Sequence, residues 1–79
     1  LLNIRGVKAS FIMTEYQNQI FVSARSIDEI NVQLIMERIG GGGHMNMAGA
    51  QLTDCTVNEA LMILENTLDQ MIEEGEINV

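Results

Sequence analysis

Gln19-Ile-Phe-Val-Ser-Ala-Arg25 is the segment that decides the predicted fold, because its side chains alternate in character. A strand has a side-chain period of two, so this segment predicts a strand with one apolar and one mixed face. The apolar face consists of Ile20, Val22 and Ala24. The mixed face carries Phe21, Ser23 and Arg25.

A second short segment, 9–14, is also rich in aromatic and β-branched residues. The polar residues 15–18 separate it from the segment 19–25, and this spacing is typical of a β-hairpin. We therefore expect the two segments to pair. One face of the hairpin belongs to the core, and the other presents the Ser23 hydroxyl beside the Arg25 guanidinium.

Two sequences have the form of a capping box, in which a hydroxyl and a carboxylate satisfy free amides at a helix start. Ser26-Ile-Asp-Glu29 predicts a helix that ends near Ile39, and Thr56-Val-Asn-Glu59 opens a longer one. In both helices the apolar residues recur at three- and four-residue steps, so one stripe packs inward. These residues are Val32, Ile35, Met36 and Ile39 in the first helix, and Val57, Ala60, Leu61, Leu64, Leu68, Met71 and Ile72 in the second.

A short strand is expected at 50–53, between the helices, and 76–79 reads as either a last strand or a frayed end. The order is then β-β-α-loop-β-α. We predict an α+β fold in which two helices pack on one face of a small mixed sheet. A chain of 79 residues supports one domain, 1–79. Because it opens with Leu1 in folded-looking sequence, we expect it to be a piece of a longer protein.

The charge balance restricts the ligands, since four Lys or Arg stand against eleven Asp or Glu and the net charge is -7. Long nucleic acid is bound mainly through many basic residues, so we expect no such partner. A small anion can still bind where the few basic groups gather. Cys55 is the only cysteine, and no apolar run approaches membrane length, so a cytoplasmic location is expected.

Gly40-Gly-Gly-Gly-His44 is the most informative stretch for chemistry. Four glycines have a high conformational entropy cost unless the chain bends sharply or something approaches the main chain closely. Such a loop can direct backbone amides at a phosphate, and His44 can donate a ring N–H to the same anion. The competing interpretation is a flexible connection with His44 on the surface, and the residues alone leave both open.

The run Val22-Ser-Ala-Arg-Ser26, followed by a helix and then Gly41-Gly-Gly-His-Met-Asn-Met-Ala-Gly49, resembles the C-terminal domain associated with DHH phosphoesterases. Within that superfamily it is most similar to the bacterial cyclic di-AMP phosphodiesterases. The resemblance covers the chain from about Val7 onward and implies a substrate-binding domain, with the glycine loop and His44 on a phosphate and the Ser-x-Arg strand as a further contact. The implied substrate-binding residues are Ser23, Arg25, Gly41, Gly42, Gly43 and His44, with Asn46 as a weaker member.

The resemblance also implies a partner, an upstream catalytic DHH domain that holds manganese, while this fragment has no cofactor and no catalytic residue of its own. One His and no clustered Asp set give no metal site here. The implied ligand is a cyclic adenine dinucleotide or a short nucleotide. Met47 stands where many members of the family have alanine, so the shape of the nucleobase pocket is expected to differ. Whether the full-length protein is anchored to a membrane through other parts stays open.

Three alternatives remain at this point. The domain could serve hydrolysis of very short RNA or of adenosine 3',5'-bisphosphate, a sibling activity in the same superfamily. It could be an RNA-binding module like the C-terminal domain of alanyl-tRNA synthetase, against which the net charge of -7 counts. It could also be a ligand-free domain that forms a homodimer through exposed faces of its helices.

Overall fold

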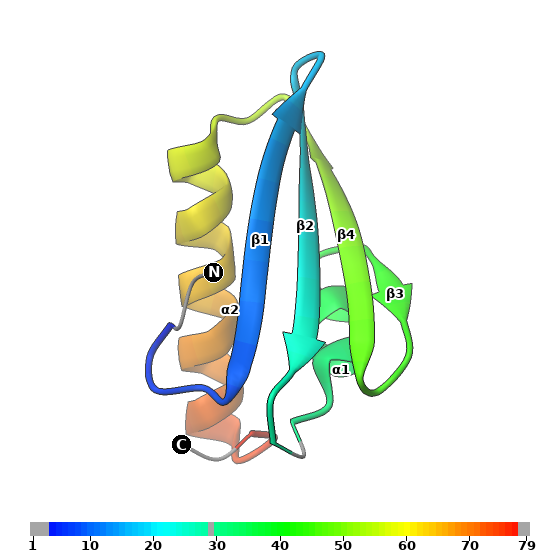
Figure 1. Ribbon diagram of the computed structural model, residues 1–79. Helices are drawn as coiled ribbons and strands as arrows, with labels where there is room; N and C mark the ends of the chain where they lie inside the picture. Colours follow the sequence, from blue (N-terminus) through cyan, green and yellow to red (C-terminus); the bar gives the residue numbers. More distant parts are fainter. Residues whose placement is uncertain (1–3, 29, 78–79) are drawn as a thin grey trace.

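The computed structural model describes residues 4–28 and 30–77, in which a four-stranded sheet packs against two helices (Figure 1). The elements are β1 (Ala9–Tyr16), β2 (Gln19–Ser26), α1 (Val32–Arg38), β3 (Gly42–Gly43), β4 (Met47–Thr53) and α2 (Val57–Glu74). The strand order is β1-β2-β4-β3, and each of these pairs is antiparallel. The α+β class is thus confirmed, with antiparallel pairing where we had expected a mixed sheet.

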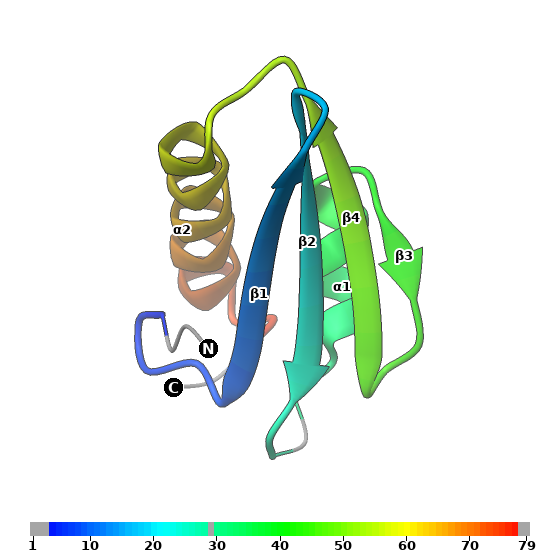
Figure 2. The same cartoon turned by 45° about the horizontal axis from the view of Figure 1, so that its top comes forward.

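The two faces of the sheet have different surroundings. Both helices lie on the face that carries Ile20, Val22 and Ala24, and these side chains are buried (Figures 1 and 2). Phe11 from β1 and Ala48 and Ala50 from β4 share that face and join the core. No described element covers the opposite face, which we call the open face. Its side chains include Ser10, Ile12, Thr14 and Tyr16 from β1, Gln19, Phe21, Ser23 and Arg25 from β2, and Met47 and Gln51 from β4.

Helix α2 begins as the sequence predicts. The Thr56 hydroxyl accepts a hydrogen bond from the Glu59 amide at 3.1 Å, and the Glu59 carboxylate accepts one from the Thr56 amide at 2.9 Å. Its buried stripe consists of Ala60, Leu64, Leu68 and Met71. Gly75 ends the helix in the left-handed conformation, with φ of 79°. Within 4–28 and 30–77, neither helix combines the length and the apolar character needed to cross a bilayer.

Helix α1 begins at a different residue from the one predicted. Ser26 is the last residue of β2, and its amide donates to the Asn46 carbonyl at 2.9 Å, so this amide is not available for the reciprocal bond of a capping box. The helix starts five residues later, where the Asn31 Oδ1 accepts from the amides of Gln33 (3.1 Å) and Leu34 (3.4 Å). The predicted helix start at Ser26 is therefore wrong, and Glu29, the other half of the predicted box, lies outside the described residues.

The last predicted elements also differ in extent. β4 begins at Met47 rather than at Ala50, because its ladder with β2 runs on to the pair of Arg25 and Met47. At the C-terminus, Glu76 and Ile77 form a bend rather than a strand, and Ile77 is buried against the core. The remainder of the predicted last strand, 78–79, lies outside the described residues.

The position of the α1 cap can be tested by substitution. Asn31→Ala removes the acceptor of two helix amides and should lower the free energy of unfolding by about 1 kcal/mol, equivalent to a fall in Tm of about 4–8 °C for a domain of this size. Ser26→Ala, at the residue predicted from sequence, should have less than half that effect. Thermal unfolding followed by circular dichroism gives both values. A larger loss of unfolding free energy for Ser26→Ala than for Asn31→Ala would show that Ser26, not Asn31, caps the helix.

Candidate functional site

The sheet register places most of the predicted site residues in two neighbouring rows on the open face. Arg25 pairs with Met47 on β4, and the His44 amide donates to the Met47 carbonyl at 2.8 Å. Arg25, Met47 and His44 therefore form one row across β2, β4 and the turn that follows β3. The adjacent row contains Ser23, Gly49 and Gly42. Since directly opposed residues of neighbouring strands share a face, both rows belong to the open face.

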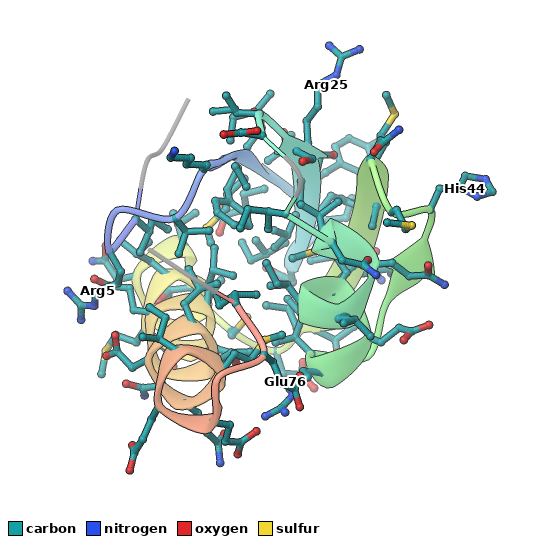
Figure 3. The ribbon with its side chains drawn as sticks, turned by 90° about the horizontal axis from the view of Figure 1, so that it is seen from below. Arg5, Arg25, His44 and Glu76 are labelled. Atoms are coloured by element: carbon teal, nitrogen blue, oxygen red, sulfur yellow. The ribbon has the colours of Figure 1, made fainter. Side chains whose placement is uncertain are left out.

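Arg25 and His44 lie at the same end of the sheet without touching. They are separated by two strand spacings, roughly 10 Å between backbones. In Figure 3 the Arg25 side chain projects from the open face, and the His44 ring projects outward beyond the edge of the sheet. A ligand that contacts both side chains has to lie over Met47, which is 55% exposed between them.

The structure explains three of the four consecutive glycines by the fold itself. Gly40 ends α1 with φ of 93°, a conformation that side chains rarely adopt. A Cβ on Gly41 would lie 2.1 Å from the Gly49 carbonyl oxygen, and one on Gly43 would lie 2.6 Å from the Ala48 Cα. The group that approaches Gly41 and Gly43 is thus the main chain of β4.

Gly42 differs from its neighbours. Its φ lies outside the positive range, and within the described part of the chain no heavy atom lies within 4 Å of a Cβ built on it. The fold therefore does not require a glycine at this position. Because Gly42 shares a row with Ser23 and Gly49, its missing side chain leaves the open face bare at that point.

The backbone amides of this stretch are mostly engaged within the protein. The Gly41 amide donates to the Met36 carbonyl at 2.7 Å, and the His44 amide is bound to Met47. In an antiparallel ladder, hydrogen-bonded and non-bonded pairs alternate, so the pair of Gly43 and Ala48 is a non-bonded one. The Gly43 amide then points away from β4, toward the edge of the sheet. Of the amides expected to converge on a phosphate, that of Gly43 is the outward one.

Three of the four basic residues are held by carboxylates. Arg5 pairs with Asp69 at 2.8 Å and with Glu65 at 3.6 Å, and Lys8 pairs with Asp28 at 3.4 Å. Arg38 joins the ends of the two helices by pairing with Glu74 and Glu76. The hydrogen bond from Arg5 to Asp69 raises the pKa of Arg5, and the one to Glu74 raises the pKa of Arg38.

Arg25 is the exception among the described residues, since no carboxylate lies within ion-pair distance of its guanidinium. Five of the acidic residues lie on α2, behind the sheet: Glu59, Glu65, Asp69, Glu73 and Glu74. Arg25 thus points away from the helix that carries five of the eleven acidic residues of this chain.

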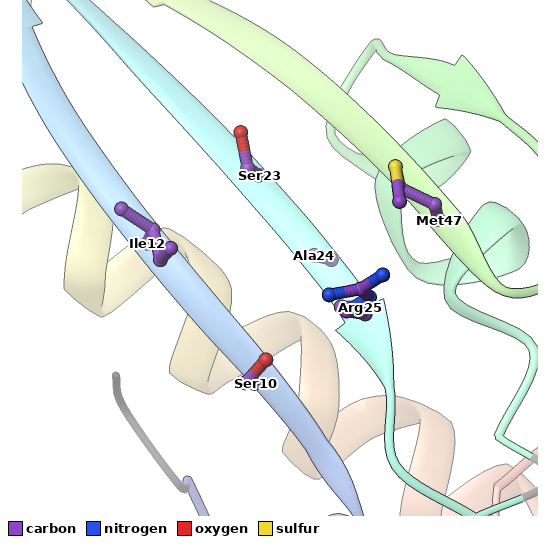
Figure 4. Close-up of a pocket in the computed structure, with 6 residues that line it drawn as sticks. All are labelled: Ser10, Ile12, Ser23, Ala24, Arg25 and Met47. Atoms are coloured by element: carbon purple, nitrogen blue, oxygen red, sulfur yellow. The ribbon is translucent and has the colours of Figure 1, made fainter.

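Two shallow depressions occupy the open face and share Ser23. The first, of about 410 Å³, is lined by Ser10, Ile12, Ser23, Ala24, Arg25 and Met47 (Figure 4). The second, of about 420 Å³, is lined by Phe21, Val22, Ser23, Gly40, Gly41, Gly49, Ala50 and Gln51. Neither lining includes an Asp or a Glu. The open face therefore offers an anion a cation and hydroxyls without an opposing carboxylate.

Sequence reasoning missed several residues of this face. Gly49 and Gln51 come from β4, and Ile12 comes from β1. The alternation within 9–14 and 19–25 could have indicated Ile12, because it puts Ile12 on the same side as Ser23. No sequence signal gives the register between β2 and β4, which brings Gly49 beside Ser23.

Asn46 lies in the bend between His44 and β4, outside the two rows. Its side chain is exposed, and its carbonyl accepts a hydrogen bond from the Ser26 amide at 2.9 Å. Within 4–28 and 30–77, no three His, Cys, Asp or Glu side chains gather in a way that could hold a metal ion. The described residues therefore do not fit a catalytic metal.

Comparison with known proteins identifies a matching domain family. The sequence model of the DHHA1 domain matches residues 1–74. The chain is 46% identical over 76 residues to the cyclic-di-AMP phosphodiesterase GdpP of Geobacillus thermodenitrificans, a match that covers 95% of this chain and 12% of that protein. It is 46% identical over 70 residues to the cyclic-di-AMP phosphodiesterase PdeA of Listeria monocytogenes, covering 87% and 11%. For GdpP of Bacillus subtilis the identity is 43% over 76 residues, covering 95% and 12%. The chain thus spans about an eighth or less of these relatives.

The contrast between neighbouring glycines gives a stability prediction. Gly41→Ala forces a Cβ against the β4 backbone and should lower the free energy of unfolding by about 1–3 kcal/mol. Gly42→Ala meets no atom and no positive φ, so its unfolding curve in urea should stay within about 0.5 kcal/mol of the original. Equal losses for both variants would contradict this assignment of the glycines.

Proposed function

This chain belongs to the DHHA1 domain family, and we propose that it is the substrate-binding domain of a phosphodiesterase that hydrolyses cyclic di-AMP. The names of the three relatives described above support this substrate. The matched region is a small part of each relative, so we expect the catalytic domain in a part of the protein outside these 79 residues. The open face of the sheet is then the surface that holds the nucleotide.

The observation that carries the proposal is the state of Arg25. In a chain with a net charge of -7, three basic residues are neutralised by carboxylates, whereas Arg25 has no carboxylate partner among the described residues. A guanidinium is suited to a phosphate because its planar N–H groups can donate two parallel hydrogen bonds. An anion site needs an exposed cation for which no neighbouring carboxylate competes with the ligand.

The other residues have roles that follow from their positions. Ser23 offers a hydroxyl two residues from Arg25 on the same strand face, next to the bare backbone of Gly49 and Gly42. The outward Gly43 amide and the His44 ring supply donors at the edge of the sheet. A phosphate over Met47 would be approached by Arg25 from one side and by His44 from the other. Gly42 then matters as the position where a side chain would block the ligand.

Catalysis is assigned to the expected upstream DHH domain. That domain would hold the metal, for which we expect manganese, and the metal supplies the activation of water for attack on phosphorus. The described residues offer no ligand set for it, so no catalytic step is attributed to them. This chain contributes orientation, because holding the nucleotide in one pose turns the attack into a positioned, effectively unimolecular step.

Arg25→Ala tests the proposal directly. A charge-assisted hydrogen bond contributes about 1.5–3 kcal/mol, so the variant should bind cyclic di-AMP roughly 10- to 100-fold more weakly than the unaltered chain. Isothermal titration calorimetry on the 79-residue chain provides the dissociation constants. Adenosine 3',5'-bisphosphate and the linear adenine dinucleotide pApA serve as comparison ligands.

The matched control is Arg5→Ala, which removes the same charge from the helix side of the molecule, where Arg5 pairs with Asp69. Its affinity should remain within about twofold of the original, because a distant exposed charge is screened by salt. Unchanged binding by Arg25→Ala, or an equal loss in both variants, would remove Arg25 from the site. Tight, salt-dependent binding of tRNA with no response to cyclic di-AMP would favour an RNA-binding module instead.

A further inference from the structure

The second depression on the open face lies beyond Ser23 from Arg25 and is not used by the phosphate contacts proposed above. Its lining combines the ring of Phe21, the amide of Gln51 and the bare backbone of Gly40, Gly41 and Gly49. Phe21 and Gln51 are direct cross-strand partners on β2 and β4. An aromatic ring and a side-chain amide therefore stand together in a depression to which three glycines contribute bare backbone, alongside Val22, Ser23 and Ala50.

Phe21 is one of two exposed aromatic residues of the chain; the other is Tyr16, which is 62% exposed at the end of β1. Phe11 is fully buried in the core, whereas Phe21 is 38% exposed on the face that lacks a covering layer. An exposed ring beside flat glycine backbone is a platform on which a planar, apolar ligand can stack. Base–aromatic stacking of this kind is common in nucleotide recognition and depends little on which base is bound.

Gln51 adds a means of discrimination. Its Nε2 donates one hydrogen to the Gln19 Oε1 at 2.7 Å, which holds the amide in one orientation, and its carbonyl oxygen can accept a hydrogen bond from a ligand. An acceptor suits a base with an exocyclic amino group, such as adenine. A base with a carbonyl oxygen at the same position, such as hypoxanthine, would place two acceptors against each other.

The distance from Arg25 fits one nucleotide. Phe21 and Arg25 are four residues apart on β2, about 13 Å along a strand. Ser23 lies midway between them, in the row where Gly49 and Gly42 leave space above the sheet. A nucleotide laid along β2 would then have its phosphate near Arg25, its ribose over Ser23 and its base near Phe21.

We propose that Phe21, Gln51 and the glycine surface beside them form a subsite for an adenine base. The proposal rests on the nucleotide-binding function argued above and adds the orientation of the ligand and the origin of base selectivity. It assigns recognition of the base to the end of the open face that is opposite to Arg25 and His44.

The experiment compares cyclic di-AMP with its hypoxanthine counterpart, cyclic di-IMP, on the 79-residue chain by calorimetry. Phe21→Leu keeps apolar bulk but loses the ring, and it should weaken both ligands about tenfold. Gln51→Met keeps the length of the side chain but removes the acceptor, and it should abolish the preference for cyclic di-AMP over cyclic di-IMP. That preference is a ratio measured on one protein sample, so a loss of folded protein does not change it.

Met62→Ala, at a 60% exposed apolar residue on α2, is the control for truncation of a surface side chain and should leave both affinities unchanged. If the chain binds cyclic di-AMP and Arg25→Ala weakens it, but Phe21→Leu and Gln51→Met behave like the unaltered chain, the base subsite is wrong and the phosphate site stands. If the unaltered chain binds neither ligand, the proposed function fails first and the subsite fails with it.

Discussion

The approach of the Gly41–Gly43 backbone to β4 is the constraint on which the geometry of the open face depends. Two positions in this stretch lie so close to β4 that a Cβ would fall within 2.1–2.6 Å of its atoms. Because no side chain intervenes, β3 can pair with β4 directly after α1, and the turn that follows brings His44 into the row of Arg25 and Met47. With larger residues at these positions, the chain would have to leave the sheet, and His44 would lose its register.

The same constraint changes the meaning of the glycine run. A run of glycines beside a histidine suggests a loop whose amides surround an anion. Here the glycines serve mainly to join a strand to the sheet, and their amides are largely used in that task. The open face gains instead from the absence of side chains at Gly42 and Gly49, which together with Ser23 leave a bare row between the positively charged and the aromatic ends.

The distribution of charge explains how an acidic domain leaves Arg25 without a carboxylate partner among the described residues. The carboxylates of α2 and of the C-terminal bend face the helix side, where they hold Arg5 and Arg38. The two-layer architecture separates this side from the open face by a full thickness of sheet and core (Figure 2). The net charge of the chain is therefore a poor guide to what Arg25 can bind. Salt screens the distant carboxylates, so the groups next to Arg25 have the larger effect.

Much of the fold was predictable because its signals are local. The alternation in 19–25 assigned the faces of β2 correctly, and Thr56 and Glu59 marked the start of α2, since each pattern depends on neighbours within one turn or one strand. The Ser26 box failed for a nonlocal reason: the Ser26 amide is held by Asn46, and no feature near Ser26 in the sequence announces that partner. Asn31, with a side chain equally able to cap, was then the residue in position to do so.

By itself the sequence determined the composition of the site: a lone His after glycines, a Ser-x-Arg strand face and few cations in an acidic chain. Only the tertiary structure decided which of these groups lie together. The pairing of β2 with β4 put Arg25 beside Met47, Ser23 beside Gly49 and Phe21 beside Gln51, and the ion pairs on the helix side left Arg25 apart from the other three cations. Register and long-range ion pairs join residues far apart in the chain, and their energies depend on how separate segments meet, which no local pattern encodes.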